Sequence, residues 1–224
     1  MAIAAWRKGV AEFVGAFTLI FIGAGAIIST GGTDLLLVAL AHGLAIGVMA
    51  SALAHISGGH FNPAVTLGAL AGRQISLRLA VVYWVSQLLG ATVAAVALLG
   101  VFPPAEWQTY SLGTPKLGPA VGWGSAILIE AVLTFFLAFV VYGTGIDPKG
   151  SFNAVGGMAI GLTISLDIMM GGPLTGAAMN PARWFGPAVV SGFFDNWYVY
   201  WIGPFLGAIV AGLLYANVFL EKPR

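Results

Sequence analysis

The sequence contains no cysteine and very little charge. Of its 224 residues, 8% are charged and 59% are hydrophobic, whereas an ordinary soluble domain carries about 25% charged residues. Without cysteine there can be no disulfide framework, no thiolate metal site and no cysteine nucleophile. So few charges cannot cover a water-facing surface, and lipid is therefore the main solvent of this chain. The net charge of +1 gives no support for binding to nucleic acid.

Six long apolar runs follow one another along the chain. Each is close to the ~20 residues with which a helix crosses a ~30 Å hydrocarbon core. Buried β-strands would be shorter, with turn signals between them. The first run retains Glu12 and lacks a small-residue cleavage site, so we expect it to stay in the membrane. We predict an all-α membrane protein with transmembrane helices at residues 10–29, 35–56, 79–101, 123–143, 153–170 and 197–219.

The basic residues support an even number of spans, which puts both termini on one side of the membrane. All of the nine Lys and Arg residues except Lys116 and Arg183 then share the side of the termini, which the positive-inside rule assigns to the cytoplasm. We therefore predict a multi-pass membrane protein with cytoplasmic termini. The short termini favour the cell membrane, and a vacuolar or other organellar membrane is the alternative.

The chain repeats itself at an offset of 118 residues, which relates Glu12 to Glu130 and Asn62 to Asn180. We predict a single domain over residues 1–224. Its first repeat covers about 1–104, a connecting loop about 105–122 and the second repeat about 123–224. Three spans per repeat is an odd number, so the second repeat must enter the membrane from the opposite face. This is an inverted repeat.

An Asn-Pro-Ala motif stands between the second and third span of each repeat. Asparagine is a favoured N-cap and proline is favoured at the first helical position. About ten helical residues follow each motif, enough for half of the hydrocarbon thickness. A single copy would be read as a loop turn, but two copies at the repeat offset predict two re-entrant half-helices that meet near the midplane. The motif residues are Asn62, Pro63, Ala64, Asn180, Pro181 and Ala182.

Irregular backbone at this depth is tolerated where it lines a water-filled cavity, so the half-helices predict a pore. Two opposed helix N-termini place positive charge at one point of the path and repel cations. The amides of Asn62 and Asn180 can donate to a passing oxygen, which would break a chain of proton transfers. Arg183 lies one turn further, and an arginine at this depth usually faces an aqueous path. The alternative is an arginine that extends to the interface.

The motifs "GGHFNPAVT" and "MNPAR", with the glutamates of "AEF" and "IEAVLTFF", resemble the aquaporin (major intrinsic protein) family over nearly the whole chain. The resemblance implies an hourglass-shaped water pore in each subunit of a homotetramer. It also implies that Glu12 and Glu130 support the two re-entrant loops, although a proton relay is an alternative for buried carboxyls. We expect His60, together with His55, to brace the first loop.

Comparison with the family also places a narrow outer constriction at His42, Ile168, Ala177 and Arg183. This set resembles that of the plant tonoplast intrinsic protein branch, whereas water-only members carry Phe and His at the first two positions. Ile168 and Ala177 would widen the constriction, and His42 and Arg183 would keep polar donors in it. The alternative for His42 is a histidine packed between helices and bonded to a backbone carbonyl.

Two positions bear on the solute. Some ammonia-permeable members of that branch have a histidine in the third loop, where this chain has Pro115. Glycerol facilitators carry Asp directly after the arginine, where this chain has Trp184, a residue that is also unusual for water channels. Pro115 therefore weakens the ammonia hypothesis without removing it, and Trp184 matches neither the glycerol facilitators nor the usual water channels.

We predict a passive channel for water, and for small neutral solutes such as ammonia and hydrogen peroxide, that excludes protons and ions. A secondary transporter with discontinuous helices is an alternative, but the loop of about four residues between the first two spans favours a rigid pore. A glycerol-type facilitator is a further alternative. An enzyme is not expected, because the sequence offers no nucleophile–base pair, metal cluster or phosphate-binding loop. We predict no cofactor and no metal site.

Overall fold

The computed structural model describes residues 3–150 and 155–221, and within these ranges the chain forms helices without a strand. Six of the helices are long and apolar enough to cross a membrane, which confirms the predicted all-α membrane fold. They are α1 (Ala5–Ser29), α2 (Leu35–Ser57), α4 (Leu77–Val101), α6 (Trp123–Val141), α7 (Gly156–Thr175) and α9 (Val199–Val218).

The span predicted at 153–170 lies further along the chain in the structure. Residues 153 and 154 fall outside the described residues, and α7 continues to Thr175 in spite of Pro173. Gly176 ends it in the left-handed conformation, at φ 81°, as Gly58 ends α2 at φ 93°. Glycine adopts this conformation without a steric penalty. The two glycines therefore turn the chain at the same point of each repeat, into the re-entrant loops.

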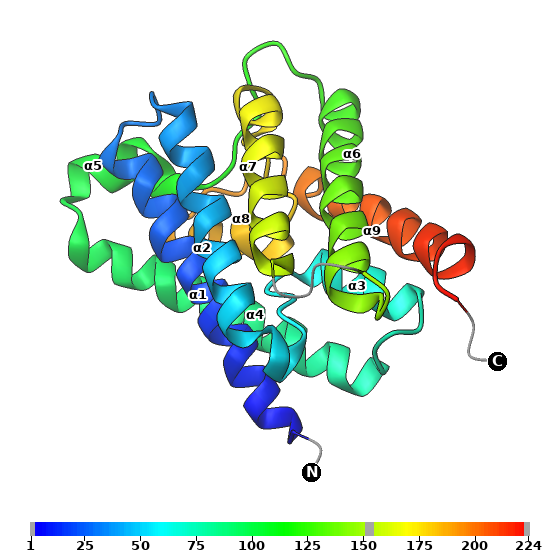
Figure 1. The fold of residues 1–224 in the computed structure, drawn as a ribbon. Helices are drawn as coiled ribbons and strands as arrows, with labels where there is room; N and C mark the ends of the chain where they lie inside the picture. Colours follow the sequence, from blue (N-terminus) through cyan, green and yellow to red (C-terminus); the bar gives the residue numbers. More distant parts are fainter. Residues whose placement is uncertain (1–2, 151–154, 222–224) are drawn as a thin grey trace.

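The two half-helices are α3 (Pro63–Ala71) and α8 (Pro181–Ser191). They lie among the long helices in Figure 1, and they contact each other. α3 packs against α4 and α9, and α8 packs against α4 and α1. The half-helices thus lie in the interior of the bundle, as the motifs predicted. The predicted boundaries of the repeats stay predictions: the first repeat ends at about 104 and the connecting loop at about 122.

Three short elements were not predicted. α5 (Pro104–Thr109) and η1 (Ser111–Gly113) lie in the connection between the repeats, and η2 (Tyr142–Ile146) continues α6 as a π-helical turn. α5 and η1 are too short to show the periodicity of a helix in the sequence. η1 packs against α1 and α8 and so holds the connecting segment over the outer end of the pore.

Glycine allows the two repeats to approach closely. α2 packs against α7 along Gly43 and Gly161. A methyl group added to Gly43 would lie 2.4 Å from the carbonyl oxygen of Gly161, and one added to Gly161 would lie 2.3 Å from that of Gly43. No larger residue fits at either position without separating the helices. Such small-residue contacts are the usual means by which membrane helices approach each other.

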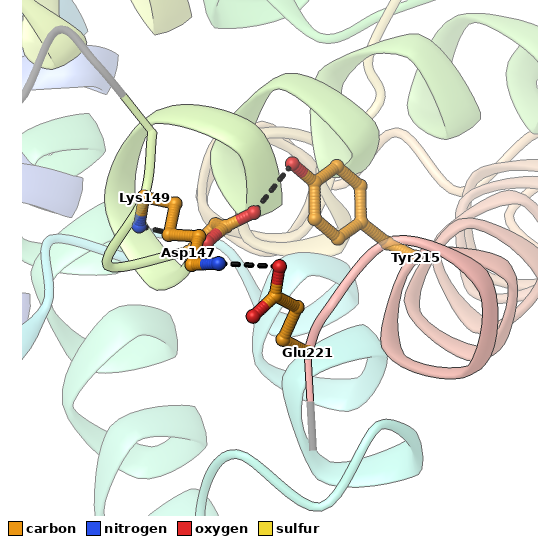
Figure 2. A network of polar contacts seen from close by, with 4 residues as sticks. All are labelled: Asp147, Lys149, Tyr215 and Glu221. Carbon is orange, nitrogen blue, oxygen red and sulfur yellow. Dashed lines mark hydrogen bonds and ion pairs between the residues drawn. The ribbon is translucent and has the colours of Figure 1, made fainter. Parts of the chain in front are cut away.

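On the same side of the bundle as the start of α7, a polar network joins η2 and the residues after it to the end of α9 (Figure 2). The Tyr215 hydroxyl donates to Asp147 Oδ2 at 3.2 Å, and Lys149 forms an ion pair with Glu221. The side chains of this pair are 65% and 72% exposed. Because exposed ion pairs contribute little to stability, the buried contacts must hold these elements in place.

Candidate functional site

The centre of the site is the meeting point of α3 and α8. Oδ1 of Asn62 accepts a hydrogen bond from the Ala64 N–H at 2.8 Å, and Oδ1 of Asn180 accepts one from the Ala182 N–H at 2.9 Å. Each asparagine thus caps its own half-helix, as the sequence predicted. The N-termini of both half-helices, with their partial positive charge, point toward the same region.

Each asparagine also holds the other repeat. Nδ2 of Asn62 donates to the carbonyl of Met179 at 2.8 Å, and Nδ2 of Asn180 donates to the carbonyl of Phe61 at 3.0 Å. A side-chain amide has two N–H groups, so one remains on each asparagine for a passing molecule. Each amide thus keeps the donor that the sequence predicts for a passing oxygen, while its other N–H ties the two tips together.

Phe61 and Met179 connect this tether to the buried glutamates. Both residues are buried and adopt a left-handed backbone conformation, at φ 50° and 52°, which is strained for any residue except glycine. The Phe61 N–H donates to Glu12 at 2.6 Å, and the Met179 N–H donates to Glu130 at 2.7 Å. Each strained residue is therefore held on both sides, by a glutamate at its N–H and by an asparagine at its carbonyl.

Glu12 and Glu130 are fully buried and make matching hydrogen bonds. Glu12 accepts from the Ser57 hydroxyl and the His60 N–H, at 2.7 and 3.0 Å. Glu130 accepts from the Thr175 hydroxyl and the Ala178 N–H, at 2.7 and 2.9 Å. These bonds support the role of loop support that the resemblance implies, and they occupy the carboxylate oxygens that a proton relay would use.

Several residues that hold the loops in place were not predicted from the sequence. Ser57 and Thr175 are related by the repeat offset, and each hydroxyl bonds to the glutamate of its own repeat. Tyr83 and Tyr200 donate to the backbone carbonyls of these two residues. The repeat itself carried the signal, because hydroxyl-bearing residues stand at equivalent positions of both halves.

A narrow cavity runs past the asparagines. A second, wider cavity opens beneath the connecting segment. Ile168 and Arg183 line both cavities, so the two meet at these side chains. Two of the four positions assigned to the outer constriction therefore lie where the path passes from the wide cavity into the narrow one. The narrow cavity, called the pore cavity below, is lined by residues that include His42, His60, Asn62, Val65, Ile168, Ala178, Asn180 and Arg183.

Arg183 is 4% exposed, and Nε and Nη1 have no hydrogen-bond partner among the described residues. A buried donor without a partner is costly unless water or a solute satisfies it. Arg183 lines both cavities, so its guanidinium group borders the path. A side chain this buried does not extend to the membrane interface.

His42 is buried and lines the pore cavity. Its Nδ1 lies 2.8 Å from the carbonyl oxygen of Val38. His42 therefore bonds to a backbone carbonyl, as a histidine packed between helices would, and it also lines the path, as a residue of the constriction would. Since a carbonyl only accepts, Nδ1 must be the donor, and Nε2 of the neutral ring is an acceptor. The expectation that His42 offers a donor to the path is therefore corrected.

Ala177 does not line either cavity among the residues described. It is fully buried with φ 43°, and its N–H donates to the Thr175 hydroxyl at 3.1 Å. The structure thus brings His42, Ile168 and Arg183 together around the path, and Ala177 is not among the described residues that line it. Its place in the constriction stays a prediction.

The first re-entrant loop is braced by one of the two expected histidines. His60 Nδ1 lies 3.1 Å from the Thr66 hydroxyl, and the backbone N–H of His60 bonds to Glu12. His55 is instead exposed on α2, so the expectation that it braces this loop is wrong. The sequence alone does not show that α2 ends at Gly58 and that His55 lies on the outer surface of this helix.

Trp184 and Pro115 have different positions relative to the path. Trp184 is buried against Tyr200, with stacked rings 5.8 Å apart, and it lines neither cavity. Its bulk therefore does not narrow the pore. Pro115 lines the outer cavity beside Lys116. Asp167 is buried on α7 with Oδ2 unpartnered among the described residues, and it lines neither the pore cavity nor the outer one.

The described residues include no cluster of three or more His, Asp and Glu side chains that could hold a metal ion. The site instead offers a narrow path with fixed hydrogen-bonding groups. Arg183 and the two helix N-termini place positive charge along it, which repels cations. Neutral molecules that form hydrogen bonds can exchange their partners step by step from one group to the next.

Comparison with known proteins matched residues 1–215 to the family model "Major intrinsic protein". The chain is 44% identical to the probable aquaporin TIP1-2 of Oryza sativa subsp. japonica, over 97% of this chain and 89% of that protein. It is 41% identical to the aquaporin TIP2-1 of Arabidopsis thaliana, over 98% and 90%. The X-ray structure of the aquaglyceroporin from Plasmodium falciparum is similar with a TM-score of 0.85 and 26% identity, over 96% of this chain and 97% of that one.

Proposed function

Because this chain belongs to the major intrinsic protein (aquaporin) family and is a passive water channel in a membrane rather than an enzyme, we propose that its pore also passes ammonia and hydrogen peroxide and excludes protons and ions. One observation carries the proposal: the path narrows where Ile168 and Arg183 line both cavities. Selectivity in such pores depends on the width, on the lining hydrogen-bond groups and on electrostatic barriers.

The constriction combines an aliphatic side chain with polar groups. Ile168 is 1% exposed and offers no hydrogen bond, whereas Arg183 brings a guanidinium group to the path and His42 offers Nε2 as an acceptor. A solute slightly larger than water, or with a different donor pattern, can pass such a site. Pro115 stands where some ammonia-permeable relatives have a histidine, so we expect a lower permeability to ammonia than to water.

The proposal is tested by permeability measurements on purified protein in lipid vesicles, with water, ammonia, hydrogen peroxide and glycerol as solutes. We expect water, peroxide and ammonia to pass well above the lipid background and glycerol to pass poorly. Fast glycerol flux would favour the glycerol facilitator instead. Saturable, ion-coupled uptake of any solute would favour a secondary transporter.

Two substitutions locate the selectivity. Ile168→His introduces the residue of water-only relatives, and we expect it to lower peroxide and ammonia permeability while water flux persists. Ile168→Leu, which conserves volume, is the matched control and should leave the ratios unchanged. His42→Ala should raise the permeability to larger neutral solutes. If solute ratios are the same in Ile168→His and His42→Ala as in the native channel, the constriction has been assigned to the wrong residues.

We propose that the channel is a homotetramer, as the family resemblance implies. The long helices expose large apolar side chains on the outside of the bundle, among them Leu128, Leu162 and Leu166, and both lipid and neighbouring copies can cover these. Native mass spectrometry of the detergent-solubilised protein tests the proposal. A predominant monomer under mild conditions would contradict it.

The preference for the cell membrane has no support in the comparisons. The relatives reported above carry the name TIP, the tonoplast branch that the constriction residues resemble. We therefore place the alternative first and propose a vacuolar or similar organellar membrane. Fluorescence microscopy of the tagged protein in its own cells, with markers for both membranes, distinguishes the two locations.

A further inference from the structure

The hydrogen bonds around His60 restrict the way in which its imidazole ring carries a proton. Nδ1 lies 3.1 Å from Oγ1 of Thr66. The Thr66 hydroxyl has one hydrogen, and it donates this hydrogen to the carbonyl of Asn62 at 3.0 Å. Oγ1 can then only accept from the ring, so the hydrogen between the two must belong to Nδ1 of His60.

Gln87 reinforces this arrangement from α4. Its Nε2 donates one hydrogen to Glu12 Oε2 at 2.7 Å and the other to Thr66 Oγ1 at 3.0 Å. A carboxylate only accepts, which fixes the end of the Gln87 amide that faces Glu12. The Thr66 oxygen therefore accepts from Gln87 as well as from His60, and its own hydrogen is left for the Asn62 carbonyl.

The other ring nitrogen of His60 is left for the pore. Nε2 makes no hydrogen bond with another residue in the described ranges, and His60 lines the pore cavity. When Nδ1 carries the hydrogen, Nε2 of the neutral ring is an acceptor. His42 has the same state because its Nδ1 donates to a carbonyl. Two acceptors thus flank the donors of Asn62 and Asn180.

The second repeat lacks this network. At the repeat offset, Ala178 stands for His60 and Trp184 for Thr66, and Arg183 stands where the first repeat has Val65. Val65 and Ala178 both line the pore cavity. At these equivalent positions the first repeat therefore pairs the acceptor of His60 with the apolar Val65, and the second repeat pairs the charged Arg183 with the apolar Ala178.

We propose that Thr66 is a positioning residue that holds His60 with the hydrogen on Nδ1, and that the resulting acceptor favours solutes rich in hydrogen-bond donors. Ammonia has three N–H groups and one lone pair. An asparagine donor occupies the lone pair, so neighbouring acceptors are needed for its hydrogens. Water, with two donors and two acceptors, depends less on this acceptor. The preference for donor-rich solutes rests on the proposed function, whereas the position of the hydrogen on the His60 ring does not.

The ring state is tested by solid-state NMR of protein labelled with ¹⁵N-histidine in lipid vesicles. The chain has three histidines, and His60→Ala and His55→Ala assign their signals. We expect protonated Nδ1 and unprotonated Nε2 for His60 and His42. Thr66→Val should shift His60 toward protonated Nε2, and Thr66→Ser should restore the native signals. Native signals with protonated Nε2 at His60, or no change in Thr66→Val, would overturn the proposal. Unchanged His42 signals show that the variants are folded.

The solute preference is tested with the same variants. Thr66→Val should lower the ratio of ammonia to water permeability about fivefold, the factor for loss of about one hydrogen bond, and Thr66→Ser should keep the native ratio. An unchanged ratio together with the expected NMR shift would overturn the solute part. If the native channel does not pass ammonia, the proposed function fails while the NMR result for Thr66 stands on its own.

Discussion

Nδ2 of Asn62 donates a hydrogen bond to the carbonyl of Met179 at 2.8 Å, and so joins the first half-helix to the loop of the second. The bond from Asn180 to Phe61 completes the pair. The tips of α3 and α8 are therefore tied by reciprocal bonds, with the strained residues Phe61 and Met179 between asparagine and glutamate. Each repeat thus fixes the backbone of the other repeat at the point where the two half-helices meet.

Asn62→Asp tests this tether. The new carboxylate can still accept from the Ala64 N–H, but it cannot donate to the Met179 carbonyl, and it adds negative charge beside the helix N-termini. We expect a lower thermal unfolding midpoint in detergent and measurable cation conductance in vesicles. Asn217→Asp is the matched control, because Asn217 lies exposed near the end of α9, where its amide bonds only within the helix. Equal behaviour of the two variants would argue against the tether.

Arg183→Val gives the second repeat the residue that Val65 supplies in the first. At an effective dielectric of ~20, a unit charge ~5 Å from the path contributes ~3 kcal/mol, so cation permeability should rise on the order of a hundredfold. Conductance of planar bilayers that contain the variant measures this. Arg78→Val, at an exposed position near the start of α4, should behave like the native channel. A cation barrier that survives in Arg183→Val would assign the exclusion to the half-helices alone.

Glu130→Gln tests the loop support. The carboxylate accepts hydrogen bonds on both oxygens, and an amide would turn an N–H toward the N–H of Met179 or Ala178. Leaving such buried donors unsatisfied should cost about 2 kcal/mol of stability and reduce water flux because the second loop is displaced. Thermal unfolding and osmotic flux measure the two effects. Glu106→Gln, on the exposed helix α5, should change neither; native stability in Glu130→Gln would contradict the role of the carboxylate.

Gly23→Ala tests the position of His42. A methyl group at Gly23 would lie 2.4 Å from Cδ2 of the His42 ring, whereas one at Gly25 would lie no closer than 3.5 Å to Leu98. Overpacking of this kind costs about 1–3 kcal/mol, and the displaced ring should reduce water flux. Gly25→Ala, on the same helix, should keep native flux. Equal flux in the two variants would show that the ring tolerates displacement.

The sequence predicted the features that follow from composition and from repetition. Low charge and six apolar runs give the membrane spans, and the offset between Asn62 and Asn180 predicts two opposed half-helices. The structure confirms the predicted N-cap role of each asparagine. These features depend on local sequence, on the membrane as solvent, or on the symmetry of the repeat.

The remaining features depend on contacts that have no local signature. The partners of the Asn62 and Asn180 amides are backbone carbonyls, which every residue has. The direction of the His42 hydrogen bond could not be predicted either, because a histidine in a helix can bond to a carbonyl or face a cavity, and here it does both. Ala177 is predicted from the family motif alone, and the motif does not show which atoms of a tight turn face the path.

We propose that the tethered tips of α3 and α8 let water pass and stop protons. Simultaneous measurement of osmotic water flux and proton flux in the same proteoliposomes, with the membrane potential clamped, tests it most directly. We expect water flux far above that of the lipid, with proton flux at the level of protein-free vesicles. Proton flux that rises together with water flux would contradict it.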